Sequence, residues 1–286
     1  MSNQRPDNRA WLLMLPAMSV LGIVGLVPLI AVFNYAFFDI FTLQSRFWVG
    51  TEWFAELVGT PDLYAALGRS LLFSALVVLV QFPLGIAIAL MIPRGRLAGS
   101  LVLMLVAIPL VVPWNLIPMI WLNLLHPTYG TVAQMFDAIG FDFDYKFNAV
   151  HTYALLVTVD TWHWIGLVVI LAYSGLSAIP PSYYQAARID GASRAQVFWH
   201  IQLPKIRPVL LMALLLRVID SLMIYVEAFG INAGGPMGAT AFLSLELGEE
   251  INAFNYGPAA ARSVLYFLLV LTVAWLFRVA MQREVK

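Results

Sequence analysis

A small number of polar side chains interrupt the long apolar runs of this 286-residue chain. Inside the hydrocarbon of a membrane such a side chain costs several kcal/mol unless it is paired or faces water, so each one is a candidate functional residue. Carboxylates and amides could hydrogen-bond the hydroxyls of a small polyhydroxylated solute, and the faces of Trp side chains could pack against its C–H groups. The candidates are Gln81, Asn115, Asp160, His163, Arg217, Asp220 and Glu227.

Two other chemistries are open to the carboxylates in this set. Asp160, Asp220 and Glu227 could relay protons in a proton-coupled secondary transporter. Asp160 and Asp220 could also form the acid dyad of an intramembrane aspartyl hydrolase, but such enzymes need a Gly-x-Gly-Asp-like motif. The chain lacks this motif, because the three residues before Asp220 are Arg-Val-Ile.

Sequence neighbours indicate different roles for the candidates. Asp160 has no basic residue one helical turn away, so it needs a partner from another segment or a watery cavity. Arg217 and Asp220 stand three residues apart on one helix face and could simply neutralise each other. His163, between two Trp residues, is suited to packing as well as to ligand contact, and Gln81, two residues before a proline, indicates a helix kink.

The composition is that of a membrane protein. Hydrophobic residues make up 61% of the chain and charged residues only 11%, whereas a soluble domain is nearer half apolar and a quarter charged. The 16 basic and 16 acidic residues cancel, and no basic block indicates nucleic-acid binding. Without Cys, disulfides and thiolate metal sites are excluded. The first apolar run has no small-residue cleavage site, so we expect a retained transmembrane helix and not a removed signal peptide.

Six apolar segments are long enough to cross a bilayer, because about 20 helical residues span ~30 Å of hydrocarbon. The sequence therefore predicts an all-α integral membrane protein with a single transmembrane domain, 1–286. Arg262 makes the start of the sixth span the least defined. The predicted spans are 11–33, 71–92, 101–125, 152–176, 209–231 and 259–280.

The distribution of Lys and Arg predicts that both termini face the cytoplasm. In that orientation the outer side holds only Arg46, Arg69, Lys146 and, at its border, Arg262. The cytoplasmic side holds Arg5, Arg9, Arg94, Arg96, Arg188, Arg194, Lys205, Arg207, Arg278, Arg283 and Lys286.

Three of the predicted spans bring polar side chains to neighbouring depths. At ~1.5 Å per helical residue, Asp160 lies about 12 Å from the outer surface and Asp220 about 16 Å from the inner surface. Counted along one continuous third helix, Trp114 and Asn115 lie about 20 Å from the cytoplasmic surface. The predicted substrate pathway consists of Trp114, Asn115, Asp160, Trp162, His163, Asp220, Tyr225 and Glu227.

One long polar segment follows the fourth predicted span. Two prolines end that span, and Ser182 is a suitable N-cap for a short helix that runs to Asp190. Gly191 breaks this helix, Ser193 can cap the next one, and Pro204 ends it. Two short helices at an angle would form a rigid knob that could transmit motion to another subunit.

A Gln-Ala-Ala triplet that begins at Gln185 is followed by Gly191 and by Ile-x-Leu-Pro at 201–204. This spacing resembles the cytoplasmic EAA loop of binding-protein-dependent ABC importer permeases, with Gln185 in place of the Glu. The resemblance implies a type I importer permease fold and a coupling loop at 182–204 that docks into an ATPase subunit. The coupling residues that it implies are Tyr184, Gln185, Ala186, Ala187, Asp190, Gly191, Ile201, Leu203 and Pro204.

The chain contains no G-x-x-x-x-G-K-[ST] phosphate loop and no Gly-Lys pair. The resemblance therefore implies a non-catalytic subunit without a cofactor of its own, with ATP and Mg bound by partner ATPase subunits. It further implies a second, similar permease and an extracytoplasmic solute-binding protein as partners. The expected location is the bacterial inner membrane, crossed several times.

A Gly-Gly-Pro loop at 234–236 and the six spans with cytoplasmic ends resemble the carbohydrate-importer branch of this family. Other stretches resemble the permeases of bacterial glycerol and related polyol importers, which implies uptake of a small polyol, glycerol first. The alternatives are glycerol phosphate and a mono- or disaccharide, and Arg217 as the single deep cation argues against a phosphate. The stretches are Asn3–Ala17, Val112–Asn115, Asp160–Trp164 and Leu215–Phe229.

Overall fold

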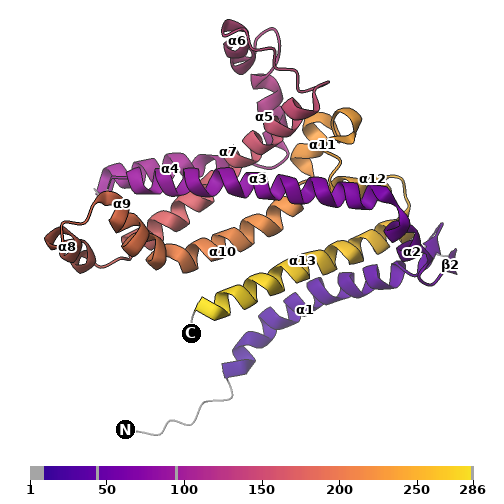
Figure 1. Ribbon diagram of the computed structural model, residues 1–286. Coiled ribbons are helices and arrows are strands. Elements are labelled where there is room, and N and C mark those ends of the chain that lie inside the picture. The colour runs from indigo at the N-terminus through magenta and orange to yellow at the C-terminus, as the bar shows by residue number, and fades with distance from the viewer. Residues whose placement is uncertain (1–9, 43–44, 94–95, 285–286) are drawn as a thin grey trace. The chain divides into compact units, whose positions relative to one another are not determined.

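A computed structural model describes residues 10–42, 45–93 and 96–284 of the chain (Figure 1). Apart from one two-stranded hairpin, the regular structure of these residues is helical, which confirms the all-α prediction. The chain divides into two compact units, of which the first holds residues up to Pro61 and Glu249–Leu269. The second holds Asp62–Gly248 and the residues from Val270 onward.

The first unit has a core of small side chains. Ala36 at the end of the first helix meets Ala260, Ala261 and Val264 near the start of the last helix, and all four are buried. An antiparallel hairpin pairs Phe38 with Trp48 beside this core. The elements are α1 (Ala10–Tyr35), β1 (Phe38–Ile40), β2 (Arg46–Trp48), α2 (Glu52–Gly59) and the first part of α13 (Tyr256–Glu284).

The second unit is built around one long helix, α7, which packs against α4 and α10. Two buried apolar clusters lie along these helices, one that includes Phe73 and Val159 and one that includes Ala89 and Val169. The elements are α3 (Pro61–Met91), α4 (Arg96–Val111), α5 (Leu116–Leu124), α6 (Thr131–Ala138), α7 (Ala149–Ser177), α8 (Pro181–Ile189), α9 (Arg194–Val197), the π-helix η1 (Phe198–Gln202), α10 (Leu203–Leu222), α11 (Val226–Asn232), the 3-10 turn η2 (Pro236–Gly238) and α12 (Leu243–Asn252).

Among the described residues, the helices α1, α3, α7 and α13 are each long and apolar enough to cross a membrane. Two further helix pairs pass the same test only together, α4 with α5 at a bend of 104° and α10 with α11 at a bend of 44°. The expected spans 101–125 and 209–231 are therefore broken helices and not continuous ones. The depth of Trp114 and Asn115, which was counted along a straight third helix, does not apply.

The two breaks have different surroundings. Pro113 lies in the first break and lacks the N–H that would continue the helix. In the second break the carbonyl of Ile224 accepts a hydrogen bond from the Ser244 hydroxyl, which satisfies a backbone group that the helix leaves unpaired. Non-helical backbone of this kind is tolerated at membrane depth where protein or a cavity satisfies it.

Helices α3 and α7 approach closely at Gly85. A Cβ atom at this position would stand 2.7 Å from Val168 Cγ1 and 2.9 Å from Val168 Cβ, which is closer than Cβ contacts come in proteins. The contact between the two helices therefore depends on the missing side chain at Gly85.

We expect Gly85→Leu to lower the free energy of unfolding by about 1–3 kcal/mol, because the added side chain overpacks the contact between α3 and α7. Chemical unfolding of the purified protein in detergent measures this change. Gly68→Leu in the same helix is the matched control, since nothing lies within 4 Å of a Cβ atom at Gly68. Equal stability of the two variants would contradict the close contact.

Candidate functional site

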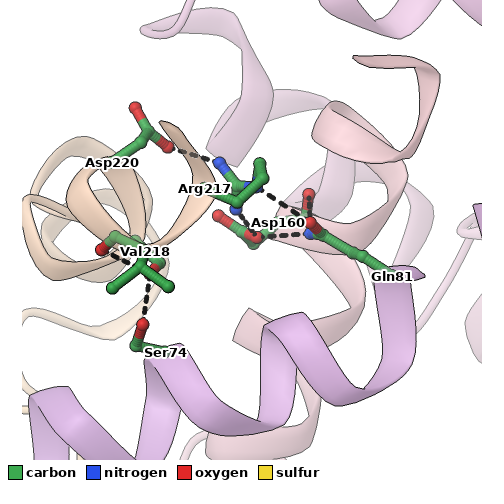
Figure 2. A network of polar contacts seen from close by, with 7 residues as sticks. Ser74, Gln81, Asp160, Arg217, Val218 and Asp220 are labelled. Atoms are coloured by element: carbon green, nitrogen blue, oxygen red, sulfur yellow. Dashed lines mark hydrogen bonds and ion pairs between the residues drawn. The ribbon is translucent and has the colours of Figure 1, made fainter. Parts of the chain in front are cut away.

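The side chain of Arg217 on α10 is fully buried, at 0% exposure, and binds acceptors from three helices. Its Nη2 donates to Asp160 Oδ2 on α7 at 2.5 Å, and its Nη1 donates to Asp220 Oδ2 on α10 at 2.6 Å. Its Nε donates to Gln81 Oε1 on α3 at 2.8 Å (Figure 2). Each guanidinium nitrogen thus has an acceptor, and we call Gln81, Asp160, Arg217 and Asp220 the Arg217 network.

Gln81 joins the two charged partners of the network. Its Nε2 donates to Asp160 Oδ2 at 2.7 Å and to the backbone oxygen of Asp160 at 3.2 Å. Since its Oε1 accepts from Arg217, one amide orients both the carboxylate and the guanidinium. The sequence assigned Gln81 to a helix kink, but the structure places it in the network. An amide within an apolar helix was the available signal.

The partner that Asp160 needs comes from another helix, which is one of the two alternatives that the sequence left open. Asp160 is only 4% exposed, and its carboxylate binds Arg217, which lies 57 residues further along the chain. The ion pair expected between Arg217 and Asp220 is also confirmed. Asp220 is 26% exposed, and Figure 2 shows its second oxygen directed away from Arg217. Asp220, unlike Asp160, therefore presents a carboxylate oxygen to the surroundings.

Aromatic rings cover one side of the guanidinium. Arg217 Cζ lies 4.7 Å from the centroid of the Trp164 ring, which is a cation–π geometry. Trp114 meets Trp164 edge-on at 5.9 Å and His163 at 6.0 Å. Trp114 is 45% exposed, so it connects the buried network with an accessible surface. The sequence alone did not indicate a role for Trp164.

The remaining candidates of the predicted pathway have varied surroundings. Glu227 in the first turn of α11 is 3% exposed and lies near enough to Asp160 and Arg217 to interact with their charges. Tyr225 stacks on Phe229 at 5.7 Å, and a Cβ atom at Gly248 would stand 2.3 Å from its ring. Trp162 meets Trp121 on α5 at 5.9 Å, and Asn115 is exposed.

The predicted coupling loop begins with helix α8, which lies together with α9 at one end of the second unit (Figure 1). Ala187 is its buried residue, at 6% exposure, while Gln185, Ala186 and Asp190 are exposed. Tyr184 packs against the second apolar cluster, as do Ile201 and Leu203 further along. The loop is therefore attached to the core by a few side chains and leaves a polar face accessible.

The turn after α8 depends on Gly191, which has a φ of +66°. This left-handed conformation favours glycine, and it lets the N–H of Ala192 donate to the Ala187 carbonyl at 2.9 Å. Ser193 then caps the next helix as expected. Its N–H donates to Gln196 Oε1 at 2.7 Å, and the N–H of Gln196 donates to Ser193 Oγ at 3.3 Å, which forms a capping box.

Two boundaries of the loop differ from the sequence prediction. Pro180 and not Ser182 occupies the N-cap of α8, because Pro181 is favourable at the first helical position. Pro204 does not end a helix but lies in the first turn of α10, where a missing N–H is tolerated. The helices α9, η1 and α10 consequently follow one another without a break, so the second arm of the loop continues into the fifth span.

Residues 81–286 match the family model described as binding-protein-dependent transport system inner membrane component. The chain belongs to this family. The matched range includes the Arg217 network as well as the coupling loop. The chain is therefore a multi-pass inner membrane permease of an ABC importer, and not a catalytic subunit.

Curated relatives and solved structures support this membership. The trehalose/maltose transport system permease protein MalF of Thermococcus litoralis is 30% identical over 94% of this chain and 92% of its own length. The sn-glycerol-3-phosphate transport system permease protein UgpA of Rhizobium meliloti is 30% identical over 86% of this chain and 84% of its own. A bacterial ABC transporter involved in alginate import superposes with a TM-score of 0.83 at 24% identity, over 97% of both chains, which shows the same fold.

Proposed function

We propose that this permease imports a small neutral polyhydroxylated solute, with glycerol as the first candidate. An extracytoplasmic solute-binding protein delivers the solute to a pathway between this subunit and a second, similar permease. Trp114, His163, Asp220, Tyr225 and Glu227 contact it, because aromatic faces and hydroxyl-binding groups together match the surface of a polyol. Asn115 and Trp162 also line this pathway. Asp160 acts indirectly, because it binds Arg217, which in turn binds Asp220.

The Arg217 network is the observation that favours a neutral solute over an anionic one. The guanidinium is buried at 0% exposure and already donates to Asp160, Asp220 and Gln81, so it is not accessible to a phosphate. Asp160, Asp220 and Glu227 together bring three carboxyl groups to one guanidinium. A phosphate ester would enter this region without an available counter-charge, and burying an unpaired charge is costly. Glycerol 3-phosphate and sugars remain the alternatives, since relatives named for both kinds of solute are similar to this chain.

The proposed topology counts each bent pair as one span, which makes six spans with both termini in the cytoplasm of a bacterium. The basic residues that then lie on the cytoplasmic side, in accordance with the positive-inside rule, are Arg96, Arg188, Arg194, Lys205, Arg207, Arg278 and Arg283. The other basic residues that support this orientation, Arg5, Arg9, Arg94 and Lys286, lie outside the described residues, as does Asn3–Arg9 of the opening stretch.

In the proposed mechanism the energy comes from partner ATPase subunits, which bind ATP and Mg, and this chain has no cofactor. The exposed face of α8 docks into an ATPase subunit, and closure of the ATPase pair moves α8. Because α9, η1 and α10 are continuous, this motion passes directly to the helix that carries Arg217 and Asp220. Through this connection, closure of the ATPase pair opens the pathway to the outside. Hydrolysis of ATP then resets the pathway.

Uptake into proteoliposomes tests the proposal. The permease is reconstituted with its partner permease, ATPases and binding protein, and labelled glycerol, glycerol 3-phosphate and maltose are offered in parallel. We expect ATP-dependent uptake of labelled glycerol, and we expect only small polyols to compete with it. Uptake of the phosphate ester or the sugar instead would disprove the polyol. Uptake that does not depend on ATP and is abolished by an uncoupler would favour a proton-coupled transporter.

Asp220→Asn is expected to lower the rate of solute uptake about tenfold, the effect of ~1.4 kcal/mol from one lost hydrogen bond to a charged acceptor. Basal ATPase activity should remain, because α8 is unchanged. Asp137→Asn on the exposed helix α6 is the control. Unchanged uptake kinetics in Asp220→Asn would remove this residue from the pathway.

A further inference from the structure

We propose that a cavity behind helix α8 binds an anionic phosphate group, supplied either by a phospholipid of the inner leaflet or by a soluble phosphate ester. The inner-leaflet source depends on the cytoplasmic position of α8 in the proposed topology. The phosphate-binding chemistry of the cavity does not depend on the transported solute.

The cavity lies where four parts of the second unit meet. It has a volume of about 520 Å³ and is lined by the ends of α3 and α7, by α8 and by Gln202 at the end of η1. Leu90, Leu176 and Ile179 supply apolar walls. This volume accommodates a glycerophosphate headgroup with the first methylene groups of its chains, and the apolar walls match those groups.

Gln202 is the first observation that points to a ligand. Its side chain is 9% exposed and lines the cavity, and its amide has no hydrogen-bond partner among the described residues. The amide is accessible from the cavity, so its N–H groups can donate to a ligand bound there. The π-helix η1 ends at this residue, and π-helical turns occur frequently at functional sites.

Arg188 is the second observation. It lies in the last turn of α8 and lines the same cavity as Gln185 and Gln202. It has no ion-pair partner in the part of the chain that the structure describes, and none of the described residues that line the cavity is acidic. A guanidinium with two amides offers several N–H donors and a positive charge, which is the arrangement that recognises phosphate oxygens.

A phosphate in this cavity would contact the coupling helix and the ends of two spans at once. Basic pockets between transmembrane helices on the cytoplasmic side are known to bind lipid headgroups. Here the bound group would hold α8 against α3 and α7, and therefore influence how firmly the motion of the ATPases is transmitted. The ligand would stabilise the contact between α8 and the ends of α3 and α7.

The test measures binding and not transport, so it is independent of the proposed solute. The complete importer, with its ATPase subunits, is reconstituted in bilayers that contain phosphatidylglycerol, and the phospholipid that stays bound after detergent extraction is counted by native mass spectrometry. In a second arm, equilibrium binding of radiolabelled inorganic phosphate and of glycerophosphate is measured. The variants are Arg188→Gln and Gln202→Leu, and Arg194→Gln, exposed at the start of α9 and outside the cavity lining, is the matched control.

We expect both cavity variants to lower phosphate-dependent binding about tenfold, since each removes hydrogen bonds to a charged group, while Arg194→Gln retains binding. Loss of retained phosphatidylglycerol alone identifies the lipid as the source, and loss of soluble phosphate binding alone identifies a free ester. Wild-type importer that binds neither probe, or variants that bind as the wild type does, would overturn the proposal. Equal loss in the Arg194→Gln control would also overturn it.

Discussion

Arg217→Met is expected to lower the free energy of unfolding of the permease by about 3–5 kcal/mol, the usual effect of removing one partner of a buried ion pair. The variant leaves Asp160 with a carboxylate that is 4% exposed and has no counter-charge. It also removes the donor to Gln81, whose Oε1 then loses its partner. Chemical unfolding of the purified permease, followed by Trp fluorescence, measures the loss.

Two further variants make this prediction specific. Arg194→Met changes an exposed Arg and should alter the unfolding free energy by less than about 0.5 kcal/mol. Asp160→Asn combined with Arg217→Met should recover part of the stability, because the double variant no longer buries an unpaired charge. If Arg217→Met unfolds at the same denaturant concentration as the wild type, the Arg217 network does not hold the three helices together.

Ala187→Glu is expected to lower ATP-driven uptake about a hundredfold while the protein remains in the membrane. Ala187 is the buried residue of α8, and a carboxylate there has to be desolvated or has to lift the helix from its seat. Either result disconnects α8 from the spans, so ATP hydrolysis should continue without uptake. Uptake and ATPase activity of the same proteoliposomes are measured together.

Gly191→Pro is the second variant for the same step. Proline fixes φ near −65°, whereas Gly191 has a φ of +66°, so the turn between α8 and α9 cannot form. Ala195→Glu introduces the same charge as Ala187→Glu at an exposed position of α9 and should transport normally. Wild-type uptake by Ala187→Glu or Gly191→Pro would disprove the assignment of α8 as the coupling helix.

Features that depend on residues close together in sequence were predicted well. The apolar runs predicted α1, α3, α7 and α13, because the length of an apolar segment is a local property and the thickness of the bilayer sets the length required. The helix before Gly191 and the N-cap at Ser193 were also predicted, since a left-handed turn and a cap each depend on a few neighbouring residues.

Features that depend on distant residues were decided by the tertiary structure. The sequence showed that Asp160 needed a partner, but not that Arg217, 57 residues away, provides it. The amide of Gln81 within an apolar helix marked that residue as a candidate, but the sequence did not show that Gln81, 136 residues from Arg217, joins the pair. The partner of a buried charge is whichever group helix packing brings into contact with it. The periodicity of a sequence does not show which distant residues come into contact. The same packing decided that the fifth span breaks before Tyr225, where Ser244 from a later helix satisfies the freed carbonyl.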